Sequence, residues 1–174
     1  MRHFLPLLIV TYVGVGVRAG DDKGVVFTSE AGKFKVTMPA KPKTMTQQAP
    51  TVAGTLDVHL FIVDQKDRGF IASYTDYPKG SVTDANRQMT LDNVRDGNAK
   101  GVKGKLASEK KITLGKKKLE GREVLIVLPG GSTVYRARIF LAGDRLYQVV
   151  VIGPEMFAKS KAANAYLDSF QIDE

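Results

Sequence analysis

The sequence predicts a single α+β domain in which an antiparallel sheet of about seven strands is flanked by helices. Three observations lead to this prediction. Segments with the period of a strand outnumber segments with the period of a helix by about seven to two. Short turns join most of these segments, which favours antiparallel pairing over long crossovers. The chain has 174 residues, a length that suits one domain.

The first nineteen residues are expected to form a secretory signal peptide. A short basic start is followed by an apolar run, residues 4–17, and Val17-Arg18-Ala19 has the small-x-small pattern of a cleavage site. The run is shorter than the ~20 residues that a membrane-spanning helix needs. We therefore expect residues 20–174 to form a mature domain that is exported to the periplasm or the extracellular space.

Three strands are expected in the first half of this domain. In residues 34–38 every second side chain is apolar, as in a strand with one solvated face. Residues 55–65 are apolar on both faces, which is typical of a central strand covered on both sides. Residues 69–78 form the third strand, which ends at a proline.

A helix is expected over residues 81–98. Ser81 and Asp84 have the spacing of a capping box, and Gly97 lies near the predicted end of the helix. Four strands follow, over residues 106–114, 118–128, 133–141 and 145–152. The last predicted helix covers residues 154–170, with a proline in its first turn and an apolar stripe formed by Met156, Ala163, Leu167 and Phe170.

Three segments carry a resemblance to a known family. They are FTSEAGKFKVTMPAKPK near the start, GREVLIVLPGGSTVYRARIFLAGDRLYQVVVIGP in the second half, and the closing AYLDSFQI. Along nearly all of the mature chain, the sequence resembles the Mog1/PsbP-like superfamily of secreted or lumenal domains. The resemblance implies a sheet of about seven strands sandwiched by helices, and a binding or accessory role instead of catalysis. Its motifs are turns and core positions, so no functional residue of the family carries over.

The mature chain lacks cysteine and the sequence motifs of several common kinds of catalysis. It has no cysteine, which removes thiol catalysis and thiolate metal sites, and its one histidine is His59. No nucleophile elbow and no phosphate-binding loop is present. We therefore predict no catalytic residue, no cofactor and no metal ligand. A pair of acids from distant segments would escape this reasoning, so a hydrolase stays an alternative.

Two arginines on one predicted strand are candidates for a structural pair or an anion contact. If Gly143-Asp144 is a two-residue turn, Arg136 and Arg138 lie on one face of the sheet. If PGGS is a four-residue loop, Glu123 lies directly opposite Arg138 and pairs with it. Arg136 has no evident acid and is expected at the sheet margin or on an anion, whereas Arg145 is expected in solvent.

Positive charge is concentrated in residues 100–122. Nine basic residues stand against two acidic ones, a net charge of +7; they are Lys100, Lys103, Lys105, Lys110, Lys111, Lys116, Lys117, Lys118 and Arg122. The segment has no aromatic residue on which bases could stack, which disfavours nucleic acid as the partner. Phospholipid headgroups, acidic envelope polysaccharide or an acidic protein are the remaining partners. Alternatively, the lysines only solubilise a hairpin and protect an edge strand.

These observations lead to three hypotheses for the function. The first is an exported, non-enzymatic binding or accessory domain that acts on a protein or an anionic envelope surface. The second is a carrier of a small ligand in an apolar cavity between the sheet and a helix. The third is a hydrolase with a carboxylate pair formed by distant segments.

Overall fold

The main body of the protein is a seven-stranded antiparallel sheet. The structure is a computed structural model, and it describes residues 24–51 and 53–173; the expected signal peptide lies outside these residues. The strand order is β3-β4-β5-β9-β8-β7-β6. The strands are β3 (Lys43–Thr51), β4 (Gly54–Gln65), β5 (Arg68–Asp76), β6 (Lys105–Leu114), β7 (Leu119–Val127), β8 (Thr133–Ala142) and β9 (Arg145–Pro154).

A second, smaller sheet joins the two ends of the described chain. It consists of β1 (Val25–Ser29), β2 (Phe34–Met38) and β10 (Gln171–Ile172), with β2 in the middle. Both pairings are antiparallel. The predicted α+β class is therefore confirmed. The strand predicted at residues 34–38 is β2 of the small sheet, and the other six predicted strands are β4 to β9 of the main sheet.

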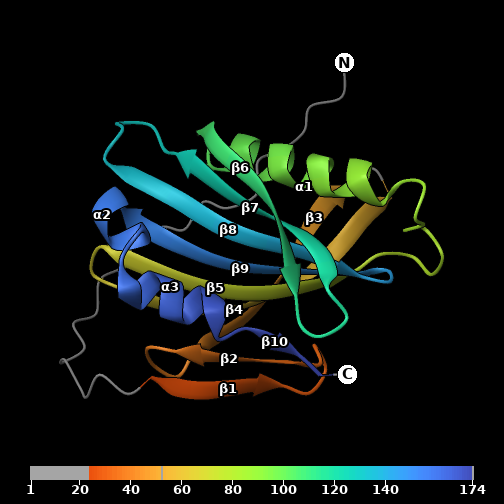
Figure 1. Ribbon diagram of the computed structural model, residues 1–174, viewed down its shortest axis with the longest axis horizontal. Helices are drawn as coiled ribbons and strands as arrows, with labels where there is room; N and C mark the ends of the chain where they lie inside the picture. Colours follow the sequence, from red (N-terminus) through yellow and green to blue (C-terminus); the bar gives the residue numbers. More distant parts are fainter. Residues whose placement is uncertain (1–23, 52, 174) are drawn as a thin grey trace.

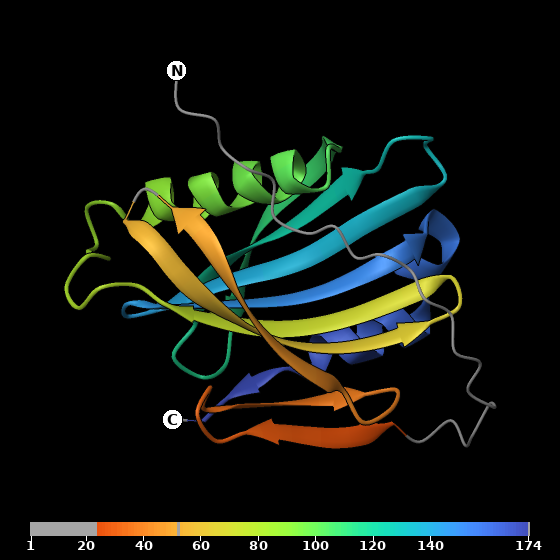
Figure 2. The same ribbon diagram turned by 180° about the vertical axis from the view of Figure 1, so that it is seen from behind.

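The helices lie on both faces of the main sheet. Helix α1 (Arg87–Gly101) covers one face, whereas α2 (Glu155–Ala158), α3 (Lys161–Asp168) and the small sheet cover the other (Figures 1 and 2). We call these the α1 side and the α3 side. None of the described helices is long and apolar enough to cross a membrane.

Each side of the sheet has its own apolar core. Leu91 of α1 is fully buried and belongs to the same cluster as Ile139 and Val150 of the sheet. On the α3 side, the ring of Phe170 lies parallel to that of Phe140, with 6.2 Å between centroids, and 5.3 Å from that of Phe34 on β2. Phe170 thus holds the small sheet, the end of α3 and the main sheet together.

Two turns fix the register of the last strands as the sequence predicted. Ala142 pairs with Arg145 across the two-residue turn Gly143-Asp144. Across the PGGS loop, the amide of Leu128 donates to the carbonyl of Thr133 over 2.9 Å. These two registers place β7, β8 and β9 side by side and decide which of their side chains share a face of the sheet.

The predicted start of the first helix is wrong. Helix α1 begins at Arg87, and Ser81 does not cap it. The carboxylate of Asp144 accepts hydrogen bonds from the amides of Gly80 and Val82, at 2.7 and 2.9 Å, and these bonds hold the preceding segment in a turn. Asp144, more than sixty residues further along the chain, therefore helps to move the start of the helix towards the C-terminus.

The predicted C-terminal helix is divided into two. Helix α2 ends at Ala158, and Ser160 caps α3 by accepting from the amide of Ala163 over 3.2 Å. Because the helix axis changes there, Met156 does not join the apolar stripe and is 88% exposed. Strand β3 was not predicted either, because its sequence KTMTQQAPT has no apolar alternation.

Candidate functional site

Strand β7 carries two buried charges of opposite sign at consecutive positions. Arg122 is 6% exposed and Glu123 is 8% exposed. Consecutive side chains of a strand point to opposite faces, so Arg122 lies on the α1 side and Glu123 on the α3 side. A buried charge requires partners, because desolvation without them is costly. Each residue is the centre of its own ionic network.

On the α3 side, three cations surround the carboxylate of Glu123. Arg138 Nε lies 2.7 Å from Oε2, and Arg136 Nη2 and Lys110 Nζ each lie 3.0 Å from Oε1. Burial opposes ionisation, but the hydrogen bonds from Arg138 and Lys110 and the charge of Arg136 outweigh it. Together they lower the pKa of Glu123 from 4.5 to about 2.

The two arginines also hold the C-terminal helices. Arg136 Nη1 donates to the carbonyl of Ala158 and to Oδ1 of Asn164, at 2.8 and 2.7 Å. Arg138 Nη2 lies 2.7 Å from Asp168 Oδ1. The expectation that Arg136 lacks an acid is wrong, because it shares Glu123 with Arg138. With most of its donors occupied by the protein, Arg136 acts in this structure as a tie between β8 and α2–α3.

A groove opens beside this network. It has a volume of about 350 Å³ and lies between β6 and the start of α3. Its lining includes Ser108, Lys110, Leu125, Arg136, Lys159 and Asn164. The ammonium of Lys159, which follows α2, lies 2.6 Å from the carboxylate of Glu155 in α2. Most of the charge around the groove is therefore paired within the protein.

On the α1 side the signs are reversed, with a cation at the centre. Arg122 Nε lies 2.8 Å from Glu109 on β6, and its Nη2 donates to Gln88 of α1 over 2.6 Å. Asp92 of α1 lies 3.6 Å from Arg122. Arg95 contacts both acids, at 2.7 Å from Glu109 and 3.3 Å from Asp92. This network binds α1 to β6 and β7.

Arg122 must therefore be removed from the predicted anion-binding residues. It is buried and its charge is used within the protein, so it does not present a cation to a partner. No local pattern predicts this burial, because Glu109 and Arg122 are on different strands and Asp92 is on a helix. Arg145 is also misplaced by the prediction, since it forms two hydrogen bonds with Asp76 on β5, at 2.5 and 2.7 Å.

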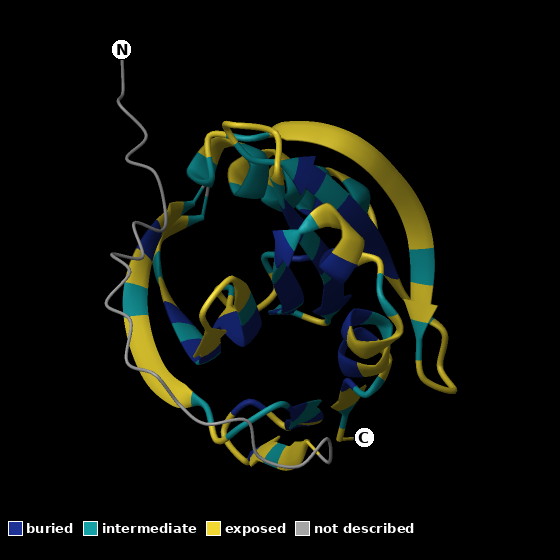
Figure 3. Cartoon of the chain, turned by 90° about the vertical axis from the view of Figure 1, so that its left-hand side faces the viewer, coloured by how far each residue is buried: buried dark blue, intermediate teal, exposed yellow. Residues whose placement is uncertain are grey.

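The eight predicted lysines are all exposed and follow one edge of the molecule. Lys100 and Lys103 lie at the end of α1; Lys105, Lys110 and Lys111 lie on β6; Lys116, Lys117 and Lys118 form the β6–β7 turn. We call the last six residues the lysine edge. Figure 3 shows β6 as a long, mostly exposed strand at the rim of the sheet. At about 3.3 Å per residue, its ten residues span roughly 33 Å.

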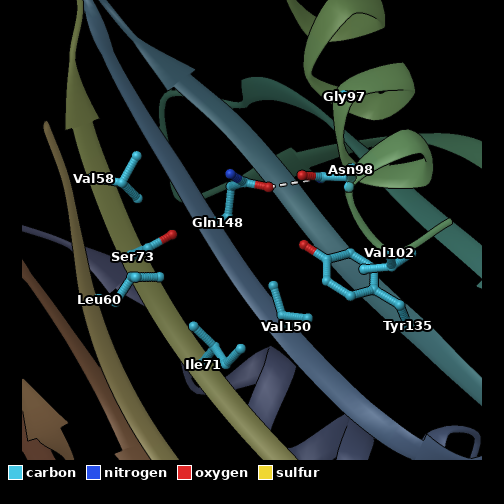
Figure 4. A pocket seen from close by; sticks show the side chains of 11 residues that line it. Val58, Leu60, Ile71, Ser73, Gly97, Asn98, Val102, Tyr135, Gln148 and Val150 are labelled. Carbon is cyan, nitrogen blue, oxygen red and sulfur yellow. Dashed lines mark hydrogen bonds between the residues drawn. The ribbon is translucent and has the colours of Figure 1, made fainter. Parts of the chain in front are cut away.

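A small cavity lies between the sheet and the C-terminal half of α1. Asn98 of α1 donates to Gln148 of β9 over 2.7 Å across it, and Tyr135 and Val150 form part of its wall (Figure 4). Its volume is about 40 Å³. Pockets for small organic ligands are usually about 300 Å³ or larger, so this cavity has room for little more than water.

The described residues contain no cluster of histidine and carboxylate side chains that could hold a metal ion. The acids that come together, Asp92 and Glu109, are both bound by Arg95 and Arg122. His59 lies between strands, with its Nδ1 3.1 Å from the hydroxyl of Thr46 and its ring stacked on Tyr74 at 4.5 Å. Asp92, Glu109 and His59 therefore take part in contacts that hold elements of the fold together.

Comparison with known proteins identifies the fold. No family model matches the sequence, and no curated protein matches it. The solution structure of cyanobacterial PsbP (CyanoP) from Synechocystis sp. PCC 6803 superimposes with a TM-score of 0.61. The chain has a PsbP-like fold. The superposition covers 92% of this chain and 98% of the cyanobacterial one, with 9% sequence identity.

A crystal structure from Bacteroides thetaiotaomicron VPI-5482 is a more distant match. It has a TM-score of 0.43 and 14% identity, and the match covers 87% of this chain and 49% of that one. The superposition on cyanobacterial PsbP confirms the predicted PsbP-like fold.

Proposed function

We propose that this protein is an exported, non-enzymatic accessory domain that binds an anionic protein or envelope surface through the lysine edge. The observation that carries the proposal is the contrast between the lysine edge and the other charges of the sheet. Arg122 and Glu123 are buried, Arg136 and Arg138 are partly buried, and all four are paired. Within residues 24–51 and 53–173, Lys105, Lys111, Lys116 and Lys118 are exposed and contact no acid.

Exposed cations on one edge attract anions over a distance set by the ionic strength. Each lysine near an anionic surface contributes roughly 1 kcal/mol, so the six lysines of this edge support weak and salt-sensitive binding. Lys110 is the least available of them, because it contacts Glu123. Its side chain is nevertheless 61% exposed.

The other two hypotheses receive less support from the geometry. A carrier needs an apolar cavity of ligand size under a helix. The cavity under α1 has a volume of about 40 Å³, and the groove of about 350 Å³ beside α3 is lined by charged side chains such as Lys110 and Arg136. A hydrolase needs two carboxylates free to act on a substrate, whereas Asp92 and Glu109 hold α1 against the sheet. Export rests on the expected signal peptide, and a mature chain that begins at Gly20 would be its direct test by mass spectrometry.

Binding to heparin and to vesicles that contain phosphatidylserine tests the function. We expect association at low salt that weakens steeply towards physiological salt, because exposed charges are screened. Replacing Lys116, Lys117 and Lys118 by glutamine should weaken it and leave the midpoint of thermal unfolding almost unchanged.

The matched control removes the same amount of charge elsewhere. Lys35 on β2, Lys43 on β3 and Lys79 after β5 are also exposed. The corresponding triple glutamine variant should bind as the wild type does. Equal binding by both triple variants would show that the lysine edge only solubilises its hairpin.

A further inference from the structure

The outer edge of β6 has free backbone groups. In the described part of the chain β6 ends the strand order, and it pairs with β7 on one side only. Alternate N–H and C=O groups of an edge strand point away from the sheet and can pair with another strand. The small sheet and the helices do not cover this edge, since seven consecutive residues from Lys105 to Lys111 are exposed.

Most of β6 is regular enough to serve as a template. Its one irregularity relative to β7 lies between Leu106 and Ser108. From Ser108 to Leu114 the register is continuous, and the strand contains no proline and no glycine. Seven regular residues are enough for an added strand of ordinary length.

The side chains of β6 define which strand would fit. Lys110 is in register with Glu123 and lies on the α3 side, whereas Lys111 is in register with Arg122 and lies on the α1 side. An added strand would therefore meet the ammonium group of Lys111 on one face. On the other face it would meet that of Lys110, which also contacts Glu123 but is 61% exposed. Opposite charges directly across a strand pair stabilise it, and like charges destabilise it.

We infer that β6 binds an extended acidic segment of a partner protein by strand addition. This inference rests on the proposed function, because it gives the anionic partner of the lysine edge a chemical class. A second copy of β6 is a poor occupant, since Glu109, the one acid of the strand, is already bound by Arg95 and Arg122. A bilayer or a polysaccharide would use the lysine charges and leave the backbone edge unpaired.

The probe is a blocked ten-residue peptide of glutamate and threonine, titrated against the mature protein. Two variants of the peptide carry methyl groups on alternate backbone nitrogens, one variant on the odd-numbered residues and the other on the even-numbered residues. Methylation removes the hydrogen-bond donors and keeps the charge. Strand addition predicts that one methylated copy binds at least about tenfold more weakly, because several hydrogen bonds are lost. Hydrogen exchange should slow at alternate amides of Ser108–Leu114. Lys111→Gln should weaken binding more than the control Lys35→Gln.

The outcomes separate the inference from the proposed function. If all three peptides bind equally and no amide of β6 is protected, strand addition is wrong, and salt-sensitive binding of heparin or vesicles would still support the lysine edge. If neither the peptides nor heparin nor vesicles bind, the proposed function is wrong and the inference is lost with it.

Discussion

Each face of β7 carries one buried charge that is neutralised by its neighbours, and the two charges have opposite signs. On the α1 side a buried cation, Arg122, is surrounded by groups from β6 and α1; on the α3 side a buried anion, Glu123, is surrounded by cations from β6 and β8. The networks differ in redundancy. Glu109 and Asp92 keep a second arginine, Arg95, if Arg122 is removed. Among the described residues, only Glu123 contacts both Arg136 and Arg138; if it is removed, Arg138 keeps the exposed Asp168, but Arg136 keeps no carboxylate.

Because of this difference in redundancy, replacing the central residue should lower the free energy of unfolding by different amounts in the two networks. A buried ion pair contributes little net stability compared with an apolar replacement, but removal of one partner leaves the other buried and uncompensated. The loss should therefore be larger where one residue serves several partners. Three changes test this comparison, from the largest expected effect to the smallest.

Glu123→Gln should lower the free energy of unfolding by about 3–5 kcal/mol, because two largely buried guanidinium groups lose their shared carboxylate. Urea unfolding measures this loss. Glu120→Gln removes the same charge from an exposed site on the same strand and should change the stability by less than about 0.5 kcal/mol. Equal effects of the two substitutions would show that the α3-side network is not a tie.

Acid should remove the same contribution from the wild type. The pKa of Glu123 is lowered from 4.5 to about 2 in the folded state, so its contribution is present above pH 4.5 and is lost as the pH falls through about 2. The size of the contribution is roughly 3 kcal/mol. The stability gap between wild type and Glu123→Gln should accordingly narrow between pH 5 and pH 2. A gap that stays constant over this range would contradict the assignment.

Arg122→Gln should have a smaller effect, of about 1–3 kcal/mol, because Arg95 continues to neutralise Glu109 and Asp92. Lys111→Gln is the control, since Lys111 is in register with Arg122 and is exposed. The double variant Arg122→Gln with Arg95→Gln should lose more than the sum of the single variants, because the two acids then lack any arginine. Additive losses would mean that Arg95 gives no backup.

The sequence predicted those contacts that follow from turn length. A two-residue turn and a four-residue loop were enough to place Glu123 opposite Arg138, and the structure has this pair in register. The contacts of Arg136 with Ala158 and Asn164 could not be predicted in the same way. They depend on where α2 and α3 pack against the sheet, and no local pattern in the chain encodes that position.

The error on Arg122 has the same origin. Alternation along β7 shows that Arg122 and Glu123 face opposite sides, but it does not show that α1 covers one of them. Glu109 of β6 and Asp92 of α1 close around Arg122 only in the folded protein. Charges that belong to a core can therefore look like part of a surface when they are counted along the chain.

The small sheet has a consequence for the order in which the protein can assemble. β10 pairs with β2, and the amide of Thr37 donates to the hydroxyl of Ser169, 132 residues further along. The sheet that β1 and β2 begin is thus complete only when β10, at residues 171–172, has joined it. Contacts this distant in sequence form slowly. A nascent chain that lacks β10 leaves one edge of β2 unpaired. The pairing of β2 with β10 is therefore expected to be among the last contacts that form during folding.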